Sequence, residues 1–195
     1  MIMGCYFMEK KVVYFETISA DNTEITFSLV KDALKETGIK KIVLASTTGA
    51  TALKAAEYFR GQDVQLIVIP HQYDFKRPQN PFSQERVKTL QEAGHQVHFG
   101  TMLFHTNELY GSTAPTIIAN LLRSFSQGVK VGFEIVLMAA DAGLAVPGEK
   151  VIAIAGTARG SDTALIMQAA SSQNPSRLRV NEIICKPLNP LNTEK

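Results

Sequence analysis

The chain has 195 residues, of which 45% are hydrophobic and 19% are charged, and its formal net charge is +2. This length and composition fit a single globular domain whose core is large enough to fold without disulfides. The charges are dispersed and form no basic stripe, which argues against binding to nucleic acid. The longest apolar run, 129–146, is broken by charged residues. It cannot supply the roughly 18 to 20 apolar residues that cross a bilayer, so we expect no membrane partner.

The cysteines indicate the cellular compartment, and the N-terminal residues concern the limits of the domain. Cys5 and Cys185 have no metal-binding spacing, and two thiols without a secretory signal indicate a reduced, cytoplasmic protein. We expect one α/β domain over residues 1–195, with 1–10 as a flexible extension. Translation starts either at Met1 or at Met8, and the sequence does not distinguish them.

Strands and helices are predicted to alternate through the first half of the chain. Turn and capping residues set the limits of these elements, because Asp and Asn favour helix starts and Gly favours helix ends. The predicted elements are a strand at 12–15, a helix from Asp21 or Asn22 to Gly38, a strand at 41–45, a helix ending near Gly61, and a strand at 64–69.

The second half continues the alternation. A loop at 70–82 precedes a helix capped by Ser83, and the segment 131–144 permits a strand or a buried helix, with its length favouring the helix. The remaining predictions are a strand at 96–99, a helix that starts at Pro115 and is ended by Gly128, a buried strand at 151–155, and closing strands at 164–169 and 182–185. This order predicts a three-layer sandwich, with a mostly parallel sheet covered on both faces.

The turn after the strand 41–45 has the composition of an anion site. It leads directly into a helix, whose N-terminus offers free N–H groups and about half a positive charge. The residues that we expect to hold a phosphate are Ser46, Thr47, Thr48, Gly49 and Thr51. The alternative is an ordinary N-cap, because Ser and Thr also favour that position.

A second polar loop follows the strand 151–155. Glycines allow close backbone approach and Arg159 offers a planar cationic fork, so this loop could form the opposite wall of the site. Asp162 would then accept from a ligand hydroxyl or brace Arg159; the alternative for the loop is a tight turn with one solvated arginine. The residues concerned are Gly156, Thr157, Arg159, Gly160, Ser161, Asp162 and Thr163.

Two further residues are candidates for ligand contact. His71 follows a strand end and could orient a ligand or act as an acid or base, although a surface histidine is an equal alternative. Glu134 lies in an apolar segment, where a carboxylate is costly unless it is paired or faces a cavity, and we expect it to gain from a nearby helix start. Asp141 is a weaker candidate on the same grounds. The histidine spacing predicts no metal site, and no catalytic nucleophile is identified.

Several segments carry a resemblance to a known family. The stretches 42–52 and 148–164 resemble the C-terminal α/β domain of pyruvate kinase, and more closely its stand-alone archaeal and bacterial relatives. The segments 14–15, 21–24 and 132–141 are similar to that stand-alone group. The resemblance covers about residues 11–187 and implies the fold of that domain. It also implies that 131–144 is a helix. The catalytic barrel of pyruvate kinase is absent from this sequence, so its activity is not implied.

The resemblance also suggests a ligand. In pyruvate kinase the matching loop receives a phosphate of an allosteric sugar bisphosphate, and the stand-alone relatives suggest flavin mononucleotide (FMN) as the cofactor. Phe75 or the wall near Glu134 would then contact the flavin ring. The alternative is a regulatory sensor of a sugar phosphate or nucleotide that performs no chemistry. We expect a phosphorylated small molecule and further copies of the chain as partners.

Overall fold

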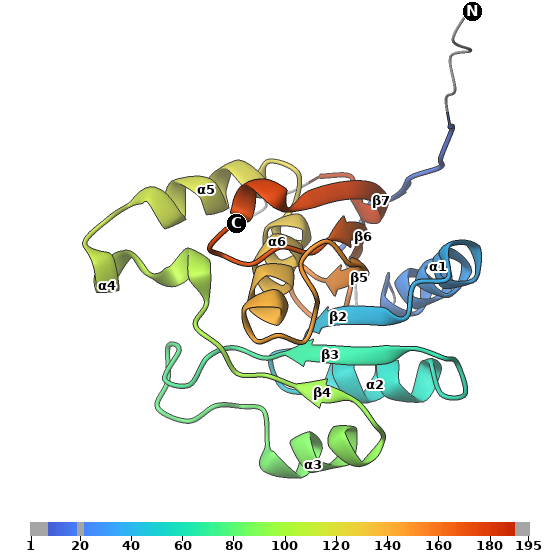
Figure 1. The fold of residues 1–195 in the computed structure, drawn as a ribbon, viewed down its shortest axis with the longest axis horizontal. Coiled ribbons are helices and arrows are strands. Elements are labelled where there is room, and N and C mark those ends of the chain that lie inside the picture. The colour runs from blue at the N-terminus through green and yellow to red at the C-terminus, as the bar shows by residue number, and fades with distance from the viewer. Residues whose placement is uncertain (1–7, 19–21, 190–195) are drawn as a thin grey trace, which may run out of the picture.

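The chain folds around one seven-stranded sheet, shown in Figure 1. The structure is a computed structural model that describes residues 8–18 and 22–189. The strands, in the order in which they lie across the sheet, are β1 (Val13–Phe15), β7 (Arg179–Pro187), β6 (Thr163–Gln168), β5 (Lys150–Ala155), β2 (Lys41–Ala45), β3 (Gln65–Ile69) and β4 (Gln96–Val97). Six of them run in the same direction, and β6 runs antiparallel to both of its neighbours.

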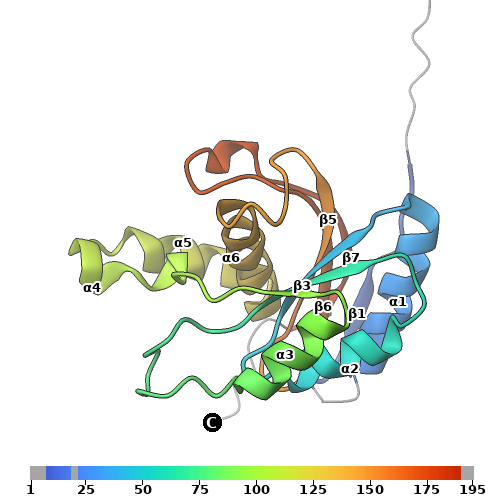
Figure 2. The same ribbon diagram turned by 60° about the horizontal axis from the view of Figure 1, so that its bottom comes forward.

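Helices cover both faces of the sheet, which gives the three layers predicted from the sequence. Helices α1 (Asn22–Thr37), α2 (Ala50–Tyr58) and α3 (Gln84–Glu92) lie on one face. Helix α6 (Gln127–Asp141) packs on the other face, and the short α4 (Asn107–Tyr110) and α5 (Ala114–Arg123) lie on that side (Figure 2). Within the described residues, no helix has the length and apolarity needed to span a bilayer.

The central strands are apolar because both of their faces are buried. In β2, Ile42 and Leu44 belong to the cluster under α1, α2 and α3, whereas Val43 belongs to the cluster under α6. All three side chains are fully buried. Complete burial of such a side chain contributes roughly 1.5–3 kcal/mol, so both clusters stabilise the same sheet.

Capping residues mark several helix limits as predicted. Ser83 accepts a hydrogen bond from Arg86 N at the start of α3, and Gly38 adopts a left-handed φ of 68° after α1. The predicted cap at Asp21 lies outside the described residues. The closing strands β6 and β7 and the helical state of 131–144 are confirmed.

The predicted role of Gly128 is wrong. Helix α5 ends at Arg123, and Gly128 instead lies in the first turn of α6, whose N-cap Ser126 accepts from Val129 N at 3.0 Å. A Cβ on Gly128 would overlap the side chain of Thr163, so glycine is needed here for α6 to approach β6. The predicted strand at 96–99 is also shorter, since β4 holds only Gln96 and Val97.

Strand direction fixes the location of the polar loops. The strand β2 pairs in parallel with both β5 and β3, so their carboxyl ends meet at the same edge of the sheet. The loops 46–49, 70–83 and 156–162 therefore start beside one another. In sheets of this kind, that edge is where ligands bind.

Candidate functional site

A cavity of about 700 Å³ opens at the carboxyl edge of the sheet. This volume is within the range of small-molecule sites, roughly 300–1,000 Å³. The lining comes from the two polar loops, the start of α2, the segment after β3, the segment before α4, the end of α5, and one side of α6. Its residues are Ala45, Ser46, Thr47, Thr48, Ala50, Thr51, Ile69, Pro70, His71, Phe75, Lys76, Met102, His105, Arg123, Gln127, Lys130, Val131, Glu134, Ile135, Met138, Gly156, Thr157, Ala158, Arg159 and Gly160.

The first loop places hydroxyl groups and a helix N-terminus at the cavity. Ser46 Oγ accepts a hydrogen bond from Ala52 N at 3.3 Å, so this serine of the preceding turn satisfies one N–H group in the first turn of α2. Thr47 Oγ1 lies 3.4 Å from His71 Nε2. Gly49 is the N-cap of the helix, with a left-handed φ of 87°, and a Cβ there would come within 2.9 Å of Arg86. The positive end of α2 is consequently directed toward the same space as the threonine side chains.

The second loop has a compact shape that its own side chains maintain. Gly156 packs against the backbone of Gly160 so closely that a Cβ would overlap the Gly160 carbonyl oxygen. Asp162 is buried, and its carboxylate accepts from Thr157 N at 2.9 Å and from Thr163 Oγ1 at 2.8 Å. Asp162 thus braces the loop backbone rather than Arg159, which corrects that expectation. Thr157 Oγ1 is buried with no hydrogen-bond partner among the described residues, although Thr157 lines the cavity.

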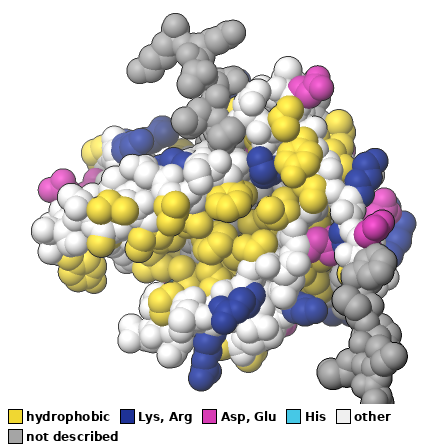
Figure 3. Space-filling model, turned by 90° about the horizontal axis from the view of Figure 1, so that it is seen from above, with side chains coloured by type: hydrophobic (Ala, Val, Ile, Leu, Met, Phe, Trp, Pro, Cys, Tyr) yellow, Lys and Arg dark blue, Asp and Glu magenta, His cyan; other side chains and the backbone are white. Residues whose placement is uncertain are grey.

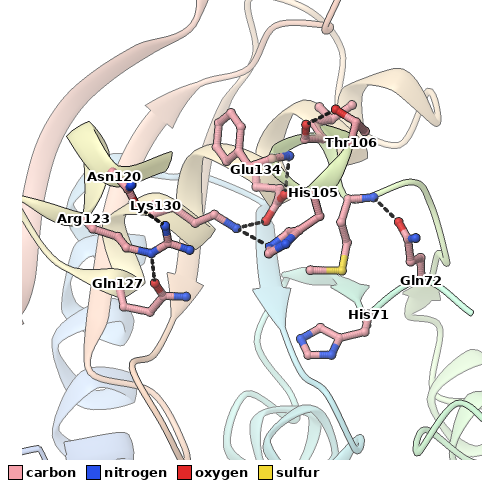
Figure 4. A network of polar contacts seen from close by, with 12 residues as sticks. His71, Gln72, His105, Thr106, Asn120, Arg123, Gln127, Lys130 and Glu134 are labelled. Carbon is pink, nitrogen blue, oxygen red and sulfur yellow. Dashed lines mark hydrogen bonds and ion pairs between the residues drawn. The ribbon is translucent and has the colours of Figure 1, made fainter. Parts of the chain in front are cut away.

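A buried polar cluster lies farther along α6 (Figure 4). Lys130 and Glu134 are one turn apart, and Lys130 Nζ lies 2.5 Å from Glu134 Oε2. The same ammonium lies 3.1 Å from His105 Nε2, and Glu134 Oε1 accepts from Phe104 N at 2.8 Å. Only 1% of Lys130 and 2% of Glu134 is exposed. The cluster joins α6 to the 3-10 helix Leu103–His105.

The position of Glu134 corrects one expectation. The carboxylate lies seven residues after the first residue of α6, too far inside for the positive helix end to compensate it. Lys130 and the Phe104 N–H compensate it instead, and the residue faces the cavity, as a buried carboxylate in this segment requires. Asp141 is exposed at the far end of α6 and accepts from Ser172 N.

Aromatic rings form a second group at the cavity. Phe75 lies edge to face between His71 and His105, with ring centroids 4.9 Å apart in both pairs. The backbone here is fixed by side-chain amides. Asn80 donates to the His71 carbonyl, and Gln72 Oε1 accepts from Met102 N at 2.7 Å.

Burial alters the acid–base behaviour of this cluster. Removal from water lowers the pKa of His71 and of His105, and the Lys130 charge adds to the decrease while Glu134 opposes it. Burial also lowers the pKa of Lys130, again against the effect of Glu134. With Lys130 donating to it, His105 Nε2 acts as an acceptor, which requires a neutral imidazole.

The cavity carries an excess of positive charge. Lys76, Arg123, Lys130 and Arg159 line it, and among the described lining residues Glu134 is the one carboxylate. Arg123 donates to two neutral groups, Gln127 Oε1 and Asn120 Oδ1, and so keeps its charge uncompensated by them (Figure 4). Such an environment favours an anionic ligand.

Most of the predicted site residues lie together at this cavity. The lining includes Ser46, Thr47, Thr48, Thr51, His71, Glu134, Gly156, Thr157, Arg159 and Gly160. Four others lie outside the lining. Gly49 is the N-cap of α2, and Ser161, Asp162 and Thr163 form the buried base of the second loop. Ser161 N donates to Thr23 Oγ1 and joins that base to α1.

Sequence reasoning missed the cationic residues Lys76, Arg123 and Lys130 and the role of His105. One signal was available, because Lys130 and Glu134 have the i,i+4 spacing of a helical ion pair within an apolar segment. Arg123 and His105 offered no such signal, since they reach the cavity from elements that are distant in sequence.

The match to a known protein family agrees with this architecture. Residues 24–167 match the family described as "Pyruvate kinase, alpha/beta domain". Two solved structures of pyruvate kinase from Cryptosporidium parvum, one in complex with ADP, share 17% and 18% sequence identity with the chain at a TM-score of 0.42. The matches cover 80% of this chain but only 24% and 25% of those enzymes. The family match spans most of the chain, which therefore belongs to the family of the pyruvate kinase alpha/beta domain.

Proposed function

We propose that the chain binds a phosphorylated small molecule in the cavity at the carboxyl edge of the sheet, and that this molecule is FMN. One observation carries the proposal. The loops that follow the adjacent strands β2 and β5 line the same cavity, and that cavity carries an excess of positive charge. The proposal concerns binding, and no reaction is assigned to the chain.

The phosphate would lie between the two polar loops. The N-terminus of α2 supplies a partial positive charge, while Thr47, Thr48 and Thr51 supply hydroxyl donors. On the other side, Arg159 can pair with phosphate oxygens through two nitrogens, and the unpartnered Thr157 Oγ1 can donate to one of them.

The rest of the cavity suits a flat ring with a polar edge. Met102, Val131, Ile135 and Met138 offer apolar contact, and Phe75 adds an aromatic edge. Lys130, Glu134 and His105 offer donors and acceptors beside these surfaces. A bound flavin would supply redox chemistry, while the chain's own residues would bind and orient it.

The test is a titration of the purified protein with FMN, followed by flavin fluorescence. We expect saturable quenching or enhancement, weakened at least tenfold by Arg159→Ala. The matched control is Arg177→Ala, which removes an exposed arginine outside the cavity lining and should leave affinity unchanged. Absence of binding at high micromolar FMN would refute the flavin assignment.

A second candidate ligand is a sugar bisphosphate or nucleotide, sensed without chemistry. The observation in its favour is the number of cations, because Lys76 and Arg123 add positive charge beyond what a single phosphate at Arg159 needs. A thermal-stability screen separates the candidates, since a ligand at a hundredfold excess over its Kd stabilises the fold by about 2.7 kcal/mol. A shift with a bisphosphate but none with FMN would favour the sensor.

A further inference from the structure

Helix α5 exposes its apolar side to solvent. Ile117, Ile118, Leu121 and Phe125 recur at helical spacing on one side of the segment, and 48–68% of each is exposed. The opposite side carries Arg123, which lines the cavity, and the buried Ala119. An amphipathic helix on a globular domain normally buries its apolar stripe. In α5 that stripe is uncovered.

Helix α4 also exposes hydrophobic side chains. Leu109 is 69% exposed and Tyr110 is 72% exposed, and α4 leads directly into α5. We call these six residues the α4–α5 apolar surface: Leu109, Tyr110, Ile117, Ile118, Leu121 and Phe125. Figure 3 shows hydrophobic side chains spread across the face that carries α5, and Figures 1 and 2 show both helices standing out at one side of the molecule.

We propose that the α4–α5 apolar surface is the interface through which two copies of this chain form a dimer. At the exposed fractions given above, the six side chains present roughly 600–800 Å² of accessible area on one protomer. A stable interface buries about 800 Å² on each partner. Monomers seldom leave an apolar patch of this size uncovered. A symmetric dimer would cover it with an identical patch.

The charge pattern favours a second copy of the chain, rather than a lipid surface, as the partner of the α4–α5 apolar surface. Within 106–126 the charged residues are Glu108 and Arg123, and Arg123 points to the cavity side. Helices that lie on membranes carry Lys and Arg on their polar face for the lipid headgroups. A nearly uncharged apolar patch suits a self-complementary contact, because it brings no like charges together across a twofold axis.

The test is the mass of the protein in solution, measured by light scattering after size-exclusion chromatography. We expect the wild-type chain at micromolar concentration to have twice its 21.4 kDa mass, and Leu121→Glu and Ile117→Glu each to give monomers. Ile25→Glu is the matched control, since Ile25 is 49% exposed on α1 in the other layer and its variant should stay dimeric.

Circular dichroism and a urea titration establish that each variant is folded before its mass is compared. A monomeric wild type would overturn the proposal. So would glutamate variants that fold and remain dimeric. A wild-type monomer that sediments with phosphatidylcholine vesicles would assign the surface to a membrane instead, which also overturns it.

Discussion

Lys130 is a buried lysine, with 1% of its surface exposed, and its neighbours determine the energetic cost of burying its ammonium group. Glu134 offers the opposite charge at 2.5 Å, and His105 accepts at 3.1 Å. The Phe104 ring lies under the same nitrogen, 5.3 Å from ring centroid to Nζ. A buried pair like this contributes little net stability, but removal of one member leaves an uncompensated charge.

We therefore predict that Lys130→Met lowers the free energy of unfolding by about 3–5 kcal/mol, as measured by urea denaturation. The double variant Lys130→Met/Glu134→Gln should recover most of this loss, because the amide is neutral and its oxygen can still accept from Phe104 N. Lys54→Met is the control, since Lys54 pairs with Glu24 at the surface and the loss should stay below about 1 kcal/mol. Equal losses for the two single variants would contradict the prediction.

His105 makes stability depend on pH. Because burial lowers its pKa in the folded state, the unfolded chain takes up a proton first as the pH falls through about 6.5, and stability is lost below that pH. One such group contributes a slope of at most about 1.4 kcal/mol per pH unit. We expect His105→Gln to flatten the decrease in unfolding free energy between pH 7 and pH 5. An unchanged slope would show that His105 titrates alike in both states.

At the scale of elements, replacing a glycine of α6 where the helix contacts β6 has two opposing effects on stability. Alanine at a helical glycine gains about 0.5–1 kcal/mol from helix propensity. At Gly128, however, a Cβ would overlap Thr163, and overpacking of this kind costs about 1–3 kcal/mol. Gly132 is one turn later on the same helix, where the nearest atom to a Cβ would be a Leu165 methyl carbon at 3.0 Å.

We predict that Gly128→Ala destabilises the protein by about 1–2 kcal/mol, whereas Gly132→Ala changes stability by less than about 1 kcal/mol in either direction. The physical difference is that a leucine methyl can rotate away and a β-branched threonine on a paired strand cannot. Urea denaturation of both variants measures it. If Gly128→Ala were the more stable protein, α6 and β6 would not be in close contact.

These elements also show what sequence can predict. Ser83 and Gly38 act locally, so their helix limits could be predicted from the neighbouring residues alone. Gly128 acts through Thr163, which is distant in the sequence, and local rules misplaced it. The site divides in the same way: each polar loop is a contiguous segment, whereas Arg123 and His105 meet the loops only through the fold.

The whole molecule has two hydrophobic clusters separated by one sheet. Leu66 lies in the cluster under α1, α2 and α3, and Leu165 lies in the cluster under α6; both are fully buried. Leu66 lies on β3 and Leu165 lies on β6. Backbone hydrogen bonds connect these two strands through β2 and β5. Loss of packing in one cluster should consequently destabilise the other cluster, because both pack on the same sheet.

We predict that Leu66→Ala and Leu165→Ala each lower the free energy of unfolding by about 2–5 kcal/mol within a single cooperative transition. The sequence contains no tryptophan, so far-ultraviolet circular dichroism and tyrosine fluorescence serve as the two probes. The urea midpoint should fall in both variants while the slope of free energy against urea stays constant, because the same surface is exposed on unfolding. Two separate transitions, or a slope reduced in one variant only, would mean that each layer unfolds on its own and that the sheet does not couple them.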